Sequence, residues 1–74
     1  MSPKIPVISG KKMISCLKKA GFVVVRQKGS HVSLRKKSFR TIVPLHNELA
    51  RGTLNNILRQ SGLTREQLQD LLNR

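Results

Sequence analysis

The chain has 74 residues and carries 15 Lys and Arg against 3 Asp and Glu, which gives a formal charge of +12 at pH 7. This charge far exceeds the magnitude of about 2–8 that keeps a small domain soluble, so it favours a polyanionic partner over a merely solvated surface. The only aromatic side chains are Phe22 and Phe39. Membrane anchors are therefore scarce, and nucleic acid is a better candidate than an anionic lipid surface.

The length allows one domain over residues 1–74, which begins with an extended arm at residues 1–8 that contains Pro3 and Pro6. The apolar runs of the sequence are short, and the N-terminus leads into no signal-peptide core. We therefore expect a cytoplasmic protein.

Residues 9–21 have the period and the end signals of an amphipathic helix. Ser9 can cap the first turn, and Gly21 stands where a left-handed stop residue belongs. The apolar positions at helical spacing are Met13, Ile14, Leu17 and Ala20, and Cys16 among them indicates a small core residue rather than a nucleophile. The cationic side contains Lys11 and Lys12, which we expect to bind the phosphate backbone of a nucleic acid.

A β-hairpin is expected next, because residues 22–27 are rich in β-branched side chains and Lys28-Gly29 can form a two-residue turn. In the register that this turn sets, Arg26 opposes His31 across the two strands. The same register places Val23, Val25, Val32 and Leu34 on the face that packs against the helices. It places Arg26, His31, Ser33 and Arg35 on the opposite face, where Val24 also falls.

The rest of the sequence predicts a third strand and two helices. Residues 36–39 suit a turn, residues 40–45 a strand, and residues 49–60 a helix that Gly62 ends. A capping-box pattern that starts at Thr64 predicts a last short helix over residues 65–73. The expected order is α-β-β-β-α plus a short C-terminal helix, an α+β domain with a three-stranded antiparallel sheet and helices on one face, as in double-stranded-RNA-binding domains.

The candidate chemistry depends on His31. Three acidic residues cannot supply the carboxylate cluster that a two-metal nuclease needs, so we expect no metal and no cofactor. RNA carries its own nucleophile, the 2′-hydroxyl, and histidine can take its proton near neutral pH. The residues alone leave two readings of His31 equally supported, a catalytic base and a polar residue on an open sheet face.

The surroundings of His31 supply groups that suit a phosphate. Gly29 lets a phosphate approach the backbone, Ser30 adds a hydroxyl donor, and the nearby cations are Arg26, Lys28 and Arg35. His46 follows the third strand and could act as an accessory acid. A structural role is favoured for His46, because no sequence feature brings it to His31.

Four segments in a fixed order resemble the HicA-type mRNA interferase toxins, the RNA-cleaving half of toxin–antitoxin pairs. These segments are Leu17-Lys18-Lys19-Ala20-Gly21-Phe22, Lys28-Gly29-Ser30-His31, Val43-Pro44-Leu45-His46, and Gly52-Thr53-Leu54 followed by residues 57–64. Many members of the family have a second histidine where this chain has Val32, and a His-Pro-Asp-Gly-like turn at residues 36–39.

The resemblance implies a double-stranded-RNA-binding-like fold, metal-independent endoribonuclease activity on mRNA, His31 as the catalytic residue, and a HicB-type antitoxin as partner. Two alternatives are kept. One is a non-catalytic RNA-binding module, which would bind RNA and leave it intact. The other is a helix-turn-helix DNA-binding regulator built from residues 54–72, although the acidic Glu66 and Asp70 on its second helix would repel phosphates.

Overall fold

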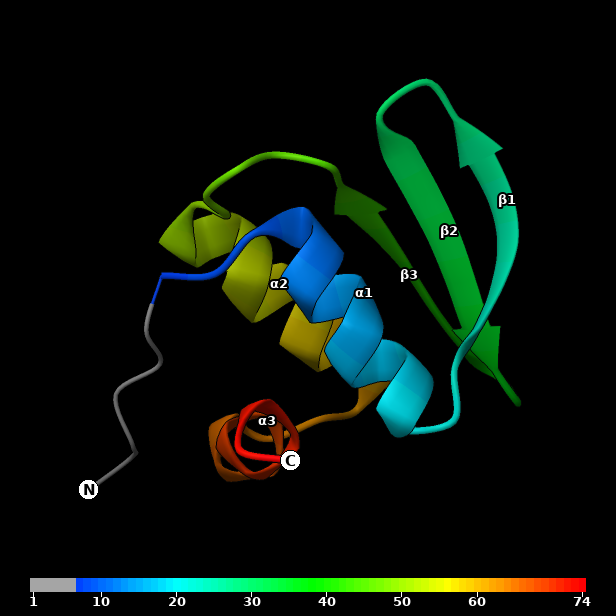
Figure 1. The fold of residues 1–74 in the computed structure, drawn as a ribbon. Coiled ribbons are helices and arrows are strands. Elements are labelled where there is room, and N and C mark those ends of the chain that lie inside the picture. Colours follow the sequence, from blue (N-terminus) through cyan, green and yellow to red (C-terminus); the bar gives the residue numbers. More distant parts are fainter. Residues whose placement is uncertain (1–6) are drawn as a thin grey trace.

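The computed structural model describes residues 7–74, and most of the expected N-terminal arm, residues 1–6, lies outside the described part. The elements are α1 (Gly10–Lys19), β1 (Val23–Lys28), β2 (His31–Lys36), β3 (Phe39–Pro44), α2 (Arg51–Ser61) and α3 (Arg65–Leu72). This order confirms the expected α+β class. Figure 1 shows the three strands as one layer with α1 and α2 against one of its faces, and α3 beneath α1.

The sheet is antiparallel with the order β1-β2-β3, so β2 is central and β1 and β3 are edge strands. Two residues form each connection, Gly29-Ser30 in the first hairpin and Lys37-Ser38 in the second. Both loops use positive φ, at Gly29 (59°) and at Lys37 (54°), as the twist of tight hairpins requires.

The register of the first hairpin differs from the prediction. The turn is Gly29-Ser30 rather than Lys28-Gly29, so Lys28 opposes His31 and Arg26 opposes Ser33. Moving the loop by one residue changes each partner by two positions, and side chains two positions apart share a face. Arg26 and His31 therefore stay on one face of the sheet, as predicted.

The apolar face was predicted correctly for β2 and wrongly for β1. Val32 and Leu34 are buried, but Val23 and Val25 are 59% and 56% exposed. The cause is a β-bulge at Val25, which inserts one extra residue so that Val24 pairs with Leu34. The bulge thus reverses the expected faces of Val23 and Val24, and all six residues of β1 are exposed.

Helix ends follow the sequence signals closely. Ser9 accepts a hydrogen bond from the backbone N–H of Lys12, and the predicted capping box at Thr64 is present, with Gln67 as its second member. Gly62 adopts the left-handed conformation after α2, as expected from its position. Because these caps satisfy backbone groups that have no partner inside the helix, they fix where each helix begins and ends.

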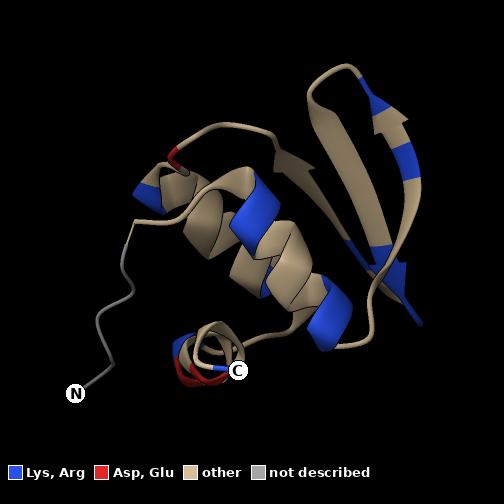
Figure 2. Cartoon of the chain, in the orientation of Figure 1, with Lys and Arg blue, Asp and Glu red and all other residues tan. Residues whose placement is uncertain are grey.

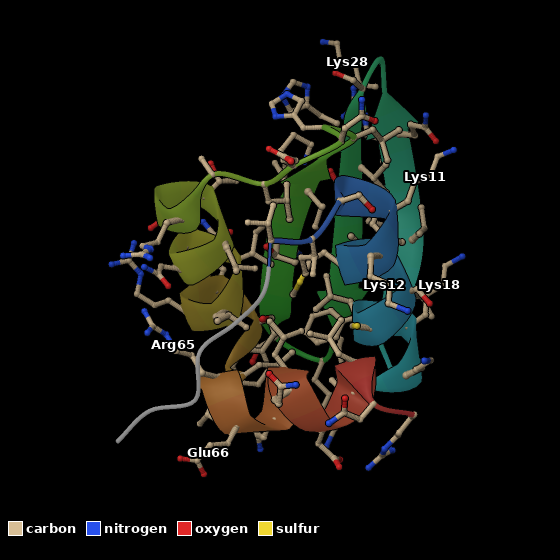
Figure 3. The ribbon with its side chains drawn as sticks, turned by 60° about the vertical axis from the view of Figure 1, so that its left-hand side comes forward. Lys11, Lys12, Lys18, Lys28, Arg65 and Glu66 are labelled. Atoms are coloured by element: carbon tan, nitrogen blue, oxygen red, sulfur yellow. The ribbon has the colours of Figure 1, made fainter. Side chains whose placement is uncertain are left out.

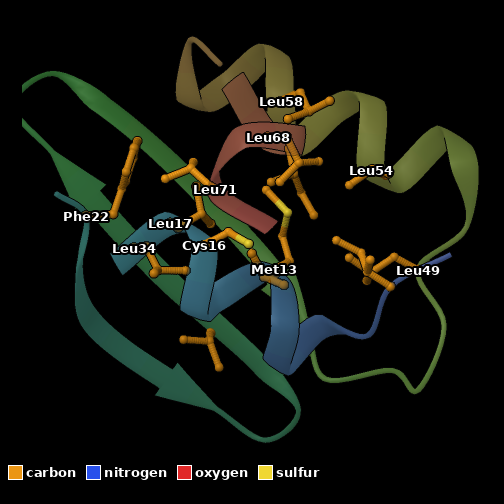
Figure 4. Packing of buried hydrophobic residues seen from close by; sticks show 14 residues of the cluster. Met13, Cys16, Leu17, Phe22, Leu34, Leu49, Leu54, Leu58, Leu68 and Leu71 are labelled. Carbon is orange, nitrogen blue, oxygen red and sulfur yellow. The ribbon is translucent and has the colours of Figure 1, made fainter. Parts of the chain in front are cut away.

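The core lies between the helices and the two strands β2 and β3 (Figure 4). Met13, Cys16 and Leu17 of α1 are fully buried, and they pack in one cluster with Leu34 and Leu68. Cys16 is therefore the small core residue that its neighbours predicted. Within residues 7–74, no helix is both long and apolar enough to cross a bilayer.

The end of the N-terminal arm that the structure describes joins this core. Ile8 is buried, and its carbonyl accepts a hydrogen bond of 2.8 Å from the backbone N–H of Leu49. This bond ties the segment before α1 to the segment before α2.

Candidate active site

The first hairpin presents His31 at the start of β2. Gly29 supplies the positive φ of the turn, and its backbone carbonyl accepts a hydrogen bond of 3.2 Å from Nε2 of Gln27. A Cβ at Gly29 would meet no atom within 4 Å, so the outer side of the turn is open. Lys28 is the cross-strand partner of His31, and such paired side chains have Cβ atoms about 5 Å apart.

A hollow of about 610 Å³ lies on the sheet face opposite the helices, around His31. The part of its lining that lies at the tip of the hairpin is Arg26, Lys28, Gly29, Ser30 and His31. These are five of the residues singled out from the sequence, and the hairpin register brings all of them together. An exposed imidazole beside two cations, in a hollow that is open along the sheet, can meet a polymeric anion.

The C-terminal end of β3 supports the turn from the other side. The backbone N–H of Leu45 donates a hydrogen bond of 2.7 Å to the carbonyl of Ser30, and Pro44 is the β3 partner of His31. His46 follows directly, so it lies at the same end of the sheet as His31. Its backbone carbonyl accepts a bond of 2.9 Å from Gly10, but His46 does not line the hollow.

Three further cations of the predicted site lie outside the hollow. Arg35 shares its sheet face but lies four residues along β2 from His31. Lys11 and Lys12 are exposed on α1, in the helical layer (Figure 3), whereas Lys28 is at the tip of the hairpin. These residues add to the field of the +12 chain but do not line the hollow.

None of the acidic residues lines the hollow around His31. Figure 2 shows the acidic positions before α2 and on α3, and basic positions on β1 and α1. Asp70 forms an ion pair of 2.8 Å with Arg74 at the C-terminus. Residues 7–74 contain no group of three or more His, Cys, Asp or Glu side chains that could hold a metal ion.

Two residues of the hollow, Ser33 and Ile42, were not among the predicted site residues. Ser33 had been placed on the correct face, and Ile42 is its partner on β3. Extending the alternation of β2 across to the third strand would have found Ile42, since paired residues share a face.

The helices proposed for DNA recognition also form. Gly62 to Thr64 connects α2 to α3, but α3 has only eight residues and buries Leu68 and Leu71 in the core. Its exposed positions include Glu66 and Asp70. Arg65 is also exposed, and Arg74 pairs with Asp70, so this surface has no net positive charge for the phosphate backbone of DNA.

A comparison with protein families identifies the family of the chain. A family model described as the HicA toxin of bacterial toxin-antitoxin matches residues 10–63, which include all three strands and the whole of α1 and α2. None of the curated proteins compared with the chain matches it. The matched segment covers well over half of the chain and contains every residue that lines the hollow. The chain therefore belongs to the HicA toxins of bacterial toxin–antitoxin systems.

Proposed function

We propose that this toxin is an endoribonuclease that cleaves mRNA in the cytoplasm without a metal ion, and that His31 is its general base. The observation that carries the proposal is the open hollow that has His31 beside Arg26 and Lys28. The antitoxin that its family membership implies is, in this proposal, a HicB-type protein that covers the same face.

The reaction needs a base for the 2′-hydroxyl and groups that stabilise the anionic transition state. The imidazole of His31 takes the proton of an RNA 2′-hydroxyl, whose oxygen attacks the neighbouring phosphorus. The bond from phosphorus to the 5′ oxygen then breaks, that oxygen takes up a proton from water, and the imidazolium of His31 returns its proton to the solvent. The products are a 2′,3′-cyclic phosphate and a 5′-hydroxyl end.

The cations of the hairpin stabilise the charge of the transition state. Negative charge grows on the phosphoryl oxygens in the transition state, and donors held in place stabilise it without reorganisation. Arg26 and Lys28 are exposed at adjacent positions on one face of β1, so their guanidinium and ammonium groups can reach a phosphate bound at His31. The backbone at Gly29, which is open on its outer side, leaves room for the phosphate.

The experiment compares purified wild-type protein with His31→Ala and His46→Ala on a short RNA in EDTA. We expect the His31 variant to lose cleavage by about 100-fold or more, the usual contribution of a general base. His46→Ala is the matched control, since His46 lies outside the hollow, and it should retain activity near the wild-type level. Full cleavage by the His31 variant would overturn the assignment.

Substrate chemistry provides an independent check. An RNA with a single 2′-deoxynucleotide lacks the proposed nucleophile at one position, so cleavage should stop there and continue elsewhere. If wild-type protein binds the RNA and leaves it intact, the chain is a non-catalytic RNA-binding module instead. In that case its affinity should still fall steeply with salt, because binding by cations releases counterions.

A further inference from the structure

A second hollow, of about 380 Å³, lies between β3 and α2. Its β3 side is formed by Arg40, Thr41 and Ile42, and the α2 residues that line it include Asn56 and Gln60. We call this hollow the β3–α2 groove. Ile42 is 55% exposed and also lines the hollow around His31, so the groove and the candidate active site share a wall.

The β3–α2 groove presents hydrogen-bond donors. Thr41 Oγ1 donates to Oε1 of Gln60 at 3.0 Å, and Arg59 Nη2 donates to Oδ1 of Asn56 at 2.8 Å. Each amide oxygen thus accepts a hydrogen bond. Within residues 7–74, no group accepts a hydrogen bond from the NH₂ group of either amide, so both NH₂ groups are available to a ligand. The guanidinium of Arg40 adds a cation at the same place.

Position along the sheet connects the groove to the proposed cleavage site. Ile42 pairs with Ser33, which is two residues from His31 on the same face, a distance of about 7 Å along the strand. Arg40 lies two residues further on β3. Ile42 therefore lies on a continuous surface from His31 to the groove, which an RNA strand with a phosphate at His31 could follow.

We propose that the β3–α2 groove binds the base of a nucleotide that flanks the cleaved phosphate and favours guanine or uracil over adenine or cytosine. The carbonyl oxygens O6 of guanine and O4 of uracil accept from the NH₂ groups of Asn56 and Gln60. In the same orientation of the base, N6 of adenine and N4 of cytosine take the places of these carbonyl oxygens, and they would place a donor against a donor. Ile42 supplies an apolar contact for the base or sugar, and Arg40 supplies one for a phosphate.

This inference rests on the proposed function, and it names the substrate preference of the same site. The main competing occupant is a peptide strand added to the outer edge of β3, with which no strand of residues 7–74 pairs. The groove favours RNA because amide donors and a cation line it and because it continues directly into the hollow around His31.

The experiment maps cut sites in a pool of randomised RNAs for wild type, Asn56→Ala and Gln60→Ala. Wild type should show guanine or uracil enriched at one position beside the cut, and each variant should reduce this enrichment by about fivefold, the loss of one hydrogen bond. Asn55→Ala is the matched control. Asn55 is exposed on the same helix and accepts an equivalent bond, 3.0 Å from Nη2 of Arg65, but it does not line the groove.

A binding assay separates this inference from the proposed nuclease activity. Short guanine- and uracil-rich RNAs and adenine- and cytosine-rich RNAs are compared for affinity to His31→Ala, with and without Asn56→Ala. If wild type cleaves nothing but the Asn56 substitution removes base-selective binding, the nuclease proposal fails and the groove stands. If substitution of Asn56 and Gln60 changes neither the cut pattern nor the base selectivity of binding, the proposed base-binding role of the groove is wrong. The edge of β3 would then be a candidate site for a protein strand.

Discussion

Substituting Gly10 by alanine tests the close contact between α1 and the end of β3. Gly10 is the first residue of α1, and its backbone N–H donates to the carbonyl of His46 at 2.9 Å. A Cβ added there would overlap the carbonyl oxygen of Pro44. It would also lie 3.0 Å from the Pro44 carbonyl carbon and 3.1 Å from Cα of Leu45, whereas ordinary contact begins at 3.4 Å. All of these atoms are backbone, so no side chain can rotate away.

Two effects of opposite sign compete in this variant. Alanine is a better helix former than glycine by about 1 kcal/mol, which alone would stabilise the protein. Overpacking against backbone costs about 1–3 kcal/mol, and weakening the bond from Gly10 to His46 adds about 1 kcal/mol. We therefore expect Gly10→Ala to lower the free energy of unfolding by about 1–3 kcal/mol, or roughly 5–20 °C in Tm for a domain of this size.

The assay is thermal and urea unfolding followed by circular dichroism, with Gly52→Ala as the matched control. Gly52 is also near the start of a helix, but a Cβ there meets nothing within 4 Å. Helix propensity should dominate in that variant and raise stability by about 0.5 kcal/mol. If Gly10→Ala proved as stable as Gly52→Ala, the packing of α1 on Pro44 would be refuted.

Three further outcomes follow from single side chains. Thr64→Ala removes the capping box of α3 and should cost about 1 kcal/mol in urea unfolding. Gly62→Ala should cost about 1–3 kcal/mol in the same assay, because φ is 70° there and a Cβ would lie 2.7 Å from the ring of Phe39; an unchanged midpoint would contradict this. Burial raises the pKa of the Cys16 thiol above its ordinary value of 9.0, more than the charges of Lys19 and Lys12 lower it. The protonated thiol thus stabilises the fold below about pH 9, and this stabilisation is lost as the pH rises further. Urea unfolding measured between about pH 8 and pH 10 should therefore show a smaller loss of stability for Cys16→Ala than for wild type.

The helices could be predicted from the sequence because their signals are local. Ser9, Gly62 and Thr64 are cap residues whose preference arises from bonds to their immediate neighbours, and all three act as predicted. The start of α2 was placed two residues early, at Leu49 rather than Arg51. Ala50, its N-cap residue, makes no side-chain cap bond, so the sequence there carries no such signal.

In the first hairpin, the shared face of Arg26 and His31 could be predicted from the sequence, whereas the faces of Val23 and Val24 could not. Paired residues share a face of the sheet, and successive residues of a strand alternate between faces. A change of register by two positions therefore keeps each side chain on its predicted face, whereas a change by one position moves it to the other face. The actual turn changes each pair by two positions and keeps Arg26 and His31 on one face, whereas the bulge at Val25 changes the register by one position. A bulge depends on contacts with the rest of the sheet, and the valine run carries no local sign of it.

The bulge also has a consequence for the proposed site. β1 is exposed along its whole length, and the core cluster contains none of its residues. The hairpin therefore holds Arg26 and Lys28 through backbone pairing with β2, not through buried side chains. Because an exposed cation on such a strand contributes little to folding, the charge around His31 can change in sequence without loss of the fold. The three valines, which the sequence pattern predicts in a core strand, lie instead in an exposed edge strand. That strand places Arg26 and Lys28 on the open face of the sheet.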